Sequence, residues 1–259
     1  MENIKTTTDA GEAVSSADLI IEAIIESIKI KRDFFGFLDT KAQAGCIFAS
    51  NTSSLSIRDI AEACSAERQA RFGGLHFFNR EYPVSRQVVP TLTVPNYPAV
   101  PAMKLVEVIK AEKTSQETFD TLVAVTKQMG KVPVNCKDTP GFIVNRLLIP
   151  YMLEAVRMAE RGDATPHDID TAMELGAGYP MGPFKLLDFV GLDTTTFISD
   201  GWREKADRGE IPKELVEKSA LLQKLVDEGK LGRKSGQGFY DVSSSGVSHS
   251  RGNADHWAV

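Results

Sequence analysis

Short apolar segments alternate with amphipathic segments through the first half of this chain, and the alternation strongly constrains its fold. Residues that favour strands (β-branched, aromatic and leucine) dominate residues 17–25, 46–50, 72–78, 104–109 and 131–136. Between these runs, apolar residues recur at helical spacing over residues 28–42, 57–63 and 116–129, and Ser56 and Ser115 are expected to cap the last two of these helices. Strands that alternate with helices across short loops predict a doubly wound parallel sheet. Pro133 in the last strand predicts that this strand lies at an edge.

The pattern changes at Asp138-Thr139-Pro140-Gly141, and the segments beyond it are helical. The expected helices begin at Phe142 and at Thr165 and then cover residues 184–190, 193–201 and 214–228. We therefore expect an incomplete, Rossmann-like parallel α/β domain over residues 1–138. An all-α domain should follow over residues 139–242, and the polar residues 243–259 should form a disordered tail.

His76 and Glu107 are the residues whose types and positions point most directly to chemistry. His76 lies near the end of the third expected strand, and an imidazole titrates near neutrality, which suits proton transfer. Glu107 lies in an apolar run, where a buried carboxylate needs a cationic or hydrogen-bonding partner. The residues alone leave open a core histidine and a solvent-facing glutamate. Parallel sheets bind ligands at the carboxyl ends of their strands, where Glu26, Ser53 and residues 76–79 fall.

Composition excludes several classes of function. A net charge of −5 argues against nucleic acid as the main partner, because phosphate binding needs a basic surface. The three cysteines have no metal-ligand spacing, so we expect no metal site. No apolar run approaches the roughly 20 residues of a spanning helix, and the N-terminus has no transit-peptide pattern.

Several sequence motifs in this chain resemble those of the NAD-dependent L-3-hydroxyacyl-CoA dehydrogenases of fatty-acid β-oxidation, most closely the short-chain mitochondrial type. The motifs are residues 74–79 (GLHFFN), 103–109 (MKLVEVI), 49–54 (ASNTSS), 137–146 (KDTPGFIVNR) and 176–184 (GAGYPMGPF). The resemblance covers about residues 6–79 and 100–241. It implies an acyl-CoA substrate, NAD as cofactor, a homodimer formed through the helical domain, and the mitochondrial matrix.

The resemblance also implies a role for each candidate residue. His76 would be the catalytic base and Glu107 the residue that orients it. Ser53 would contact both substrate and cofactor, and Asn145 would hydrogen-bond the reacting substrate. The remaining matches are expected at the NAD site and are Glu26, Lys31, Asn79 and Lys234. Without the family, the residues alone favour a structural role for each: a helix cap for Ser53, a turn residue for Asn79, and solvated charges for Glu26, Lys31 and Lys234.

Two departures from the family bear on activity. Residues 80–99 are an insert relative to the family, with prolines at 83, 90, 95 and 98. We expect this insert to loop out and leave His76 beside Glu107, because doubling the length of a flexible loop costs only about 0.6 kcal/mol. The family's Gly-x-Gly-x-x-Gly turn and first βαβ unit are not in this sequence. We therefore expect little or no activity from these 259 residues, and recovery when such a unit is added and residues 80–99 are deleted.

Three functions remain open at this point. The first is a dehydrogenase acting on L-3-hydroxyacyl-CoA, which transfers a hydride between the C3 hydroxyl and NAD. The second is a non-catalytic truncated member that keeps only the dimerising helical domain, which NADH titration would distinguish from the first. The third is a related dehydrogenase acting on a free hydroxy acid or sugar acid, which would show turnover without CoA.

Overall fold

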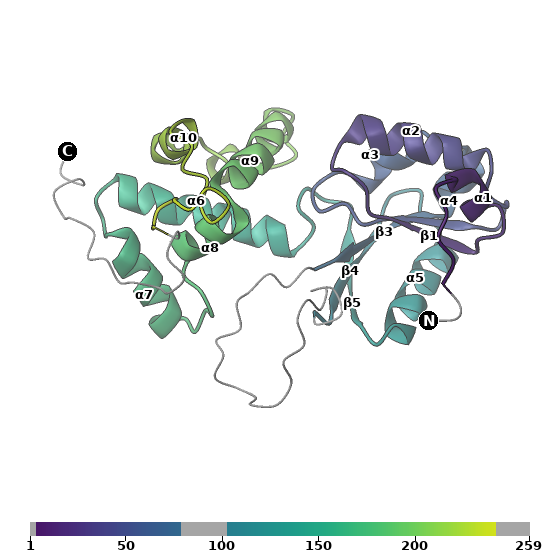
Figure 1. Ribbon diagram of the computed structural model, residues 1–259, viewed down its shortest axis with the longest axis horizontal. Coiled ribbons are helices and arrows are strands. Elements are labelled where there is room, and N and C mark those ends of the chain that lie inside the picture. Colours follow the sequence, from purple (N-terminus) through teal and green to yellow (C-terminus); the bar gives the residue numbers. More distant parts are fainter. Residues whose placement is uncertain (1–3, 79–102, 242–259) are drawn as a thin grey trace. The chain divides into compact units, whose positions relative to one another are not determined.

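The computed structural model describes residues 4–78 and 103–241, and the chain divides into two compact units between Ile143 and Val144 (Figure 1). The expected insert, Asn79 and the expected tail lie outside the described residues. The division falls just beyond the Asp138-Thr139-Pro140-Gly141 segment. Each unit is described below by itself.

A five-stranded sheet forms the centre of the first unit, with the order β1-β2-β3-β4-β5. The strands are β1 Leu19–Glu22, β2 Ile47–Ser50, β3 Phe72–Phe77, β4 Leu105–Lys110 and β5 Val132–Lys137. The pairs β1–β2, β2–β3 and β4–β5 are parallel, as predicted, and β5 lies at the edge, as Pro133 predicted. The pair β3–β4 is antiparallel, so the prediction of an entirely parallel sheet was wrong there. Parallel pairing needs a crossover, usually a helix, which the prolines between these strands disfavour.

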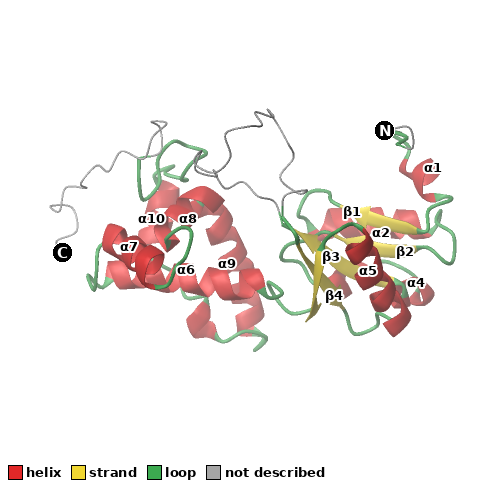
Figure 2. Ribbon diagram, turned by 90° about the horizontal axis from the view of Figure 1, so that it is seen from below, coloured by secondary structure: helices red, strands yellow, loops and turns green. Residues whose placement is uncertain are grey.

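Helices cover both faces of this sheet. Figure 1 shows α2 and α3 on the face opposite α5, and Figure 2 shows α5 in front of the yellow strands. The helices of this unit are α1 Ala10–Val14, α2 Ile28–Asp39, α3 Ile57–Ala61, α4 Ala66–Ala70 and α5 Gln116–Gln128. One buried cluster joins the α2–α3 face and includes Phe35, Phe48 and Phe72. A second cluster includes Leu75, Val108 and Leu122 of α5 and fills the other face. Each face therefore has its own apolar core, as strands buried on both faces require.

Serine side chains begin two of these helices as predicted. The Ser56 hydroxyl accepts a hydrogen bond from the backbone N–H of Asp59 at the start of α3. The Ser115 hydroxyl does the same for Thr118 in α5. The short helix α4 was not predicted, because five residues are too few to show helical periodicity.

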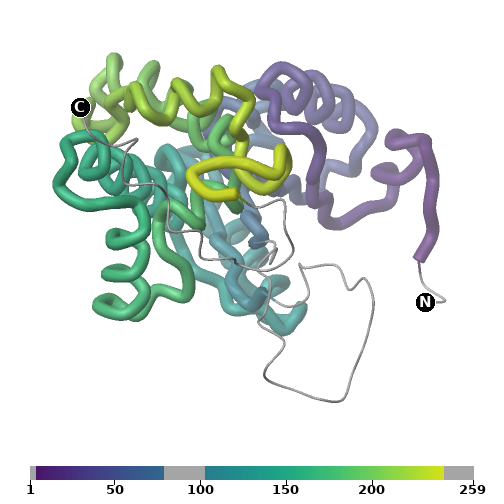
Figure 3. Tube along the Cα trace, turned by 60° about the vertical axis from the view of Figure 1, so that its left-hand side comes forward, coloured from purple at the N-terminus to yellow at the C-terminus, as the bar shows by residue number. Residues whose placement is uncertain are grey.

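The second unit is helical in its described part, which contains no β-strand beyond isolated bridges at residues 232–241. Its elements are α6 Val144–Glu160, α7 Pro166–Gly176, α8 Pro183–Val190, α9 Leu192–Asp207, the 3₁₀ turn η1 Lys213–Leu215 and α10 Ala220–Asp227. The single helix predicted over residues 214–228 was wrong, because Ser219 starts a new helix by capping Leu222. The loop drawn in yellow in Figure 3 folds back onto α8, where Arg233 N donates to Asp188 O.

Candidate active site

His76 and Glu107 form a buried pair at the end of the sheet in the first unit. His76 of β3 and Glu107 of β4 are direct partners in the antiparallel register, so their side chains leave the same face. His76 Nδ1 lies 2.7 Å from Glu107 Oε2. The residues are 6 % and 0 % exposed, respectively. The predicted contact is therefore present although 31 positions separate the two residues.

The chemistry of this contact follows from the atoms that make it. A carboxylate only accepts hydrogen bonds, so the proton between the two groups belongs to Nδ1 of His76. Nε2 then carries the lone pair and is the atom available to take a proton. Glu107 stabilises the imidazolium that results. The pair can thus act as a general base with a fixed tautomer.

The second oxygen of Glu107 is held by the segment that leaves the sheet. Ile143 N donates to Glu107 Oε1 at 3.1 Å. The preceding residue, Phe142, has a φ of 51°, which is rare for a residue with a side chain. Its ring lies 5.7 Å from the imidazole of His76, and the ring of Phe78 lies 4.4 Å from it on centroids. Glu107 therefore cannot rotate without breaking a second bond, and aromatic rings surround the base.

The α6 helix begins at Val144 rather than at the predicted Phe142, because the backbone just before Val144 is not helical. Gly141 and Phe142 both adopt positive φ, which interrupts a right-handed helix. Neither Phe142 nor its conformation was predicted to belong to the site. The Pro140-Gly141 pair, a turn signal immediately before it, was the available indication.

A loop at the end of β2 brings three other predicted residues together. Glu26 Oε1 accepts hydrogen bonds from Ser53 N at 3.0 Å and from Thr52 Oγ1 at 2.6 Å. Lys31 lies 3.4 Å from the other oxygen of Glu26 and is only 1 % exposed. Burial alone would raise the pKa of Glu26, but the Thr52 hydrogen bond and the charge of Lys31 lower it below its ordinary value.

Asn51 fastens the same loop to the strand that carries His76. Its side-chain Oδ1 accepts a hydrogen bond from Phe77 N at 2.8 Å, one residue beyond His76. The loop with Ser53 and the strand with His76 are thereby held at the same end of the sheet. Asn51 was not predicted as a site residue, although it directly follows a strand.

Glu22 is a charged residue at this end of the sheet that was not predicted as a site residue. It is 2 % exposed and pairs with Lys31 at 2.6 Å. The available signal was a lone acidic residue inside an apolar run.

The two remaining predicted residues belong to the second unit. Asn145 is the second residue of α6. Lys234 lies in the loop after α10 and forms an ion pair with Asp193 of α9. Their expected roles beside substrate and cofactor stay predictions.

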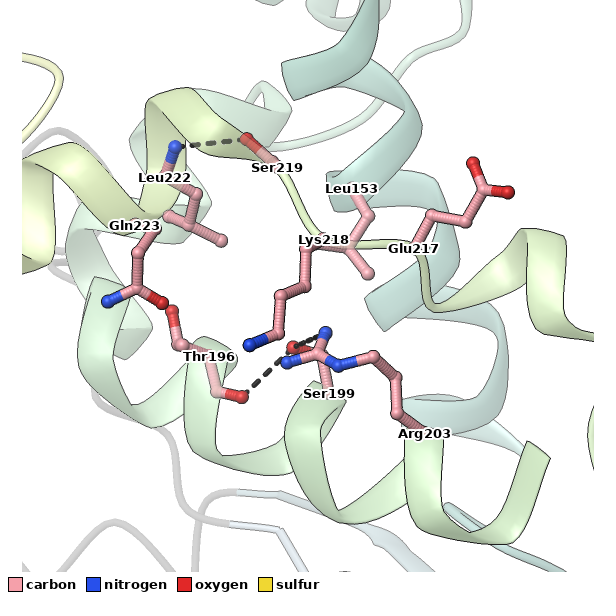
Figure 4. Close-up of a pocket in the computed structure, with 9 residues that line it drawn as sticks. All are labelled: Leu153, Thr196, Ser199, Arg203, Glu217, Lys218, Ser219, Leu222 and Gln223. Atoms are coloured by element: carbon pink, nitrogen blue, oxygen red, sulfur yellow. Dashed lines mark hydrogen bonds between the residues drawn. The ribbon is translucent and has the colours of Figure 1, made fainter. Parts of the chain in front are cut away.

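A small pocket inside the second unit lies between α6, α9 and the segment before α10 (Figure 4). Its hydroxyl groups are used locally, since Ser199 Oγ donates to Thr196 O and Ser219 Oγ accepts from Leu222 N. Its charged lining residues are Lys218, Arg203 and Glu217. None of the predicted site residues lines this pocket.

Across residues 4–78 and 103–241 there is no grouping of His, Cys, Asp or Glu that could hold a metal, and no helix long and apolar enough to span a membrane.

Comparison with known proteins covers nearly the whole chain. Residues 1–87 and 96–139 match the family model described as the 3-hydroxyacyl-CoA dehydrogenase NAD binding domain, and residues 141–242 match the C-terminal domain of the same family. The human mitochondrial hydroxyacyl-coenzyme A dehydrogenase is 55 % identical over 240 residues, which cover 93 % of this chain and 68 % of the relative. The 3-hydroxybutyryl-CoA dehydrogenase of Clostridioides difficile is 41 % identical, with 94 % and 77 % covered.

Solved structures agree with the sequence matches. The crystal structure of (S)-3-hydroxybutyryl-CoA dehydrogenase from Ralstonia eutropha superposes with a TM-score of 0.77 at 34 % identity, covering 91 % of this chain and 74 % of that one. The fold and both family models agree on one family, and the pairing of His76 with Glu107 is consistent with it. This chain belongs to the 3-hydroxyacyl-CoA dehydrogenase family.

Proposed function

We propose that this chain is an NAD-dependent dehydrogenase that transfers a hydride between the C3 hydroxyl of an L-3-hydroxyacyl-CoA and NAD. The observation that carries the proposal is the buried contact of 2.7 Å between His76 Nδ1 and Glu107 Oε2. Oxidation of a secondary alcohol needs a base for the hydroxyl proton, and His76 Nε2 supplies it. Membership of the family supports the acyl-CoA substrate.

The chain's own residues divide the remaining work. No side chain accepts a hydride, so NAD supplies that chemistry when bound. The hydroxyl of Ser53 and the carboxylate of Glu26 follow β2 and β1 at the carboxyl end of the parallel strands, where sheets of this class hold nucleotides, and these groups fit such a cofactor. Ser53 and Asn145 are proposed to position the substrate oxygen for His76. Asn79 and Lys234 are proposed cofactor contacts from the family resemblance.

The direct test is turnover of acetoacetyl-CoA. The rate is measured at fixed pH as the decrease in NADH absorbance. The 259-residue chain is assayed alone, and in parallel as a second form that has a Gly-x-Gly-x-x-Gly βαβ unit added before it and residues 80–99 deleted. We expect turnover that requires CoA from the second form, and little or none from the 259 residues alone. Absence of turnover from both forms would contradict the proposal, and turnover of a free hydroxy acid without CoA would replace it with the third candidate.

The non-catalytic alternative is not favoured. Burying a carboxylate costs free energy unless its partners compensate, and Glu107 is buried with both oxygens bonded. The relatives that match over more than nine-tenths of this chain are named as dehydrogenases.

We also propose a homodimer formed through the helical unit. Large apolar side chains are exposed on its helices, with Leu175 83 %, Leu147 69 % and Phe197 67 % exposed. We propose that these side chains become buried between two copies of the chain, because burial of exposed apolar surface favours association. Light scattering at micromolar concentration should give twice the monomer mass, and Phe197→Asp should shift the protein towards monomer. A monomeric wild type would contradict this proposal.

A mitochondrial location is proposed from relatives alone. The human, pig and mouse proteins that match this chain at 54–55 % identity are each named as mitochondrial. Immunofluorescence of the endogenous protein together with a matrix marker tests the proposal, and a signal confined to the cytosol would contradict it.

A further inference from the structure

Glu22, the last residue of β1, is a buried carboxylate to which no role has been assigned. Its described hydrogen bonds are to Lys31, Ile24 and Ser50, at the end of the sheet that carries the candidate active site. Oε1 accepts from Lys31 Nζ and from Ile24 N, both at 2.6 Å. Oε2 accepts from Ser50 Oγ at 2.6 Å. Glu22 is 2 % exposed and Lys31 is 1 % exposed. A charge pair buried this completely is retained only where its geometry and its additional hydrogen bonds compensate for lost hydration.

Lys31 connects Glu22 to a second carboxylate. Its ammonium group also donates to Ile24 O at 3.2 Å and lies 3.4 Å from Glu26 Oε2. An ammonium group has three protons, and these three oxygen partners account for them. Lys31 therefore acts on the site through Glu26, whose orientation it fixes.

Glu26 in turn holds the loop that carries Ser53. Its Oε1 accepts from Thr52 Oγ1, from Ser53 N, and from Ser54 N and Oγ, at 2.6–3.2 Å. Successive backbone N–H groups that converge on one oxygen form an anion-binding turn, here filled by a side chain of the protein itself. The backbone of the loop thus depends on where the Glu26 carboxylate lies.

The contacts of Glu22 and Glu26 hold this loop from both ends. Ser50, the residue before the loop, bonds to Glu22, while residues 52–54 bond to Glu26. Asn51, between them, accepts from Phe77 N beside His76. A displacement of Glu22 would release Ser50 directly and would release Ser53 through Lys31 and Glu26.

We propose that Glu22 is a positioning residue, which acts through Lys31 and Glu26 to fix the loop from Asn51 to Ser54 and hence to place Ser53 at the end of the His76 strand. The proposal rests on the proposed function for its link to turnover. Its structural claim concerns the loop alone and can be tested without cofactor or substrate.

The test is hydrogen exchange of the Ser53 and Ser54 amides, compared with the amides of β4 in the same sample. Glu22→Gln alone leaves Lys31 buried without a carboxylate partner and can unfold the chain. The deciding variant is therefore Glu22→Gln with Lys31→Met, which removes both charges at similar volume. We expect exchange of the two loop amides to rise by about tenfold relative to β4.

A second ion pair in the same unit supplies the matched control. Arg68, 4 % exposed, pairs with Asp39 at 2.8 Å, and neither residue has a described hydrogen bond or ion pair with the loop. Asp39→Asn with Arg68→Met should change exchange in the loop and in β4 by the same factor. Equal loop and β4 changes in the Glu22 double variant would overturn the proposal.

Order of action can be tested by adding Glu26→Gln. Ser50 bonds to Glu22 directly, so this test is confined to the Ser53 and Ser54 amides, which bond to Glu26. If Glu22 acts on these two amides through Glu26, their exchange in the triple variant should not rise further than in Glu26→Gln alone. In the active form, the Glu22 double variant should lower kcat/KM by about tenfold while the Arg68 control does not. Selective exchange with unchanged kcat/KM would overturn the positioning role. A wild type without turnover would refute the proposed function and leave the exchange result to decide the loop claim.

Discussion

Asp188 of α8 is expected to make the stability of the helical unit depend on pH. It is 3 % exposed, and its two oxygens accept hydrogen bonds from Phe239 N at 2.7 Å and Tyr240 N at 2.9 Å. Burial raises the pKa of Asp188 to about 6, against the opposing effect of these two N–H groups, and the nearby charge of Asp170 adds to the rise. Asp188 thus holds the loop after α10 with a carboxyl group that titrates near neutrality.

The size of the effect follows from the pKa. An unfolded chain would titrate this carboxyl near 3.8, so its ionisation in the fold costs about 3 kcal/mol, at about 1.4 kcal/mol per pKa unit. Between pH 4 and 6 the folded state holds more protons than the unfolded state. The free energy of unfolding therefore falls as pH rises through this window, and the Asp188 contribution is lost above pH 6.

Asp188→Asn removes the ionisation and keeps one acceptor oxygen. The side-chain amide then opposes one of the two backbone N–H groups, which costs about 1–3 kcal/mol at every pH. The free energy of unfolding of the wild type, relative to that of the variant, should accordingly fall by about 2–3 kcal/mol from pH 4 to pH 7. Urea unfolding, monitored by circular dichroism at each pH, measures this change. Carboxylates other than Asp170, whose charge acts on Asp188, contribute equally to both proteins.

Asp227→Asn, at an exposed position on α10, is the matched control for loss of an aspartate in the same unit. Curves for wild type and Asp188→Asn that run parallel from pH 4 to pH 7 would show that the Asp188 carboxyl does not titrate as its burial implies.

Four further substitutions, at three positions, test packing and helix capping in the first unit by urea unfolding. Phe142→Gly relieves the positive φ but removes a ring that is 4 % exposed, so we expect a net loss of about 2–4 kcal/mol, and Phe142→Ala should lose about 1 kcal/mol more. Gly74→Ala should cost about 1–3 kcal/mol, because a Cβ there would lie 2.8 Å from Ile109 and 2.9 Å from Ile57. Ser115→Ala should cost about 1 kcal/mol through the lost cap of α5. Wild-type midpoints for these variants would contradict the packing described.

Much of the framework follows from the sequence because it depends on local pattern. Apolar runs located all five strands, and Ser56 and Ser115 were recognised as caps because a cap bonds within three residues. The contact between His76 and Glu107 was predicted because a long connection costs little free energy compared with strand pairing.

The features that the sequence did not reveal depend on distant partners. Lys31 gave no sign that its ammonium group is buried, because Glu22 lies on another element and the pair shows no periodic pattern. Phe142 adopts a positive φ only because its ring packs in the core and the next N–H bonds to Glu107. The antiparallel pairing of β3 and β4 could not be read from either strand, because the residues of a strand do not set the direction of its partner.

The role of the base is tested most directly by the rate of acetoacetyl-CoA reduction after His76→Asn, in the form of the protein that turns over fastest. We expect kcat to fall about 100- to 10,000-fold, because the proton-transfer group is lost. His167→Asn, whose side chain is 64 % exposed, is the matched control and should keep the wild-type rate. Glu107→Gln should lower kcat more than it changes KM, because it acts on the imidazolium rather than on binding. A His76→Asn variant with the kcat of the control would contradict the assignment of His76 as the catalytic base.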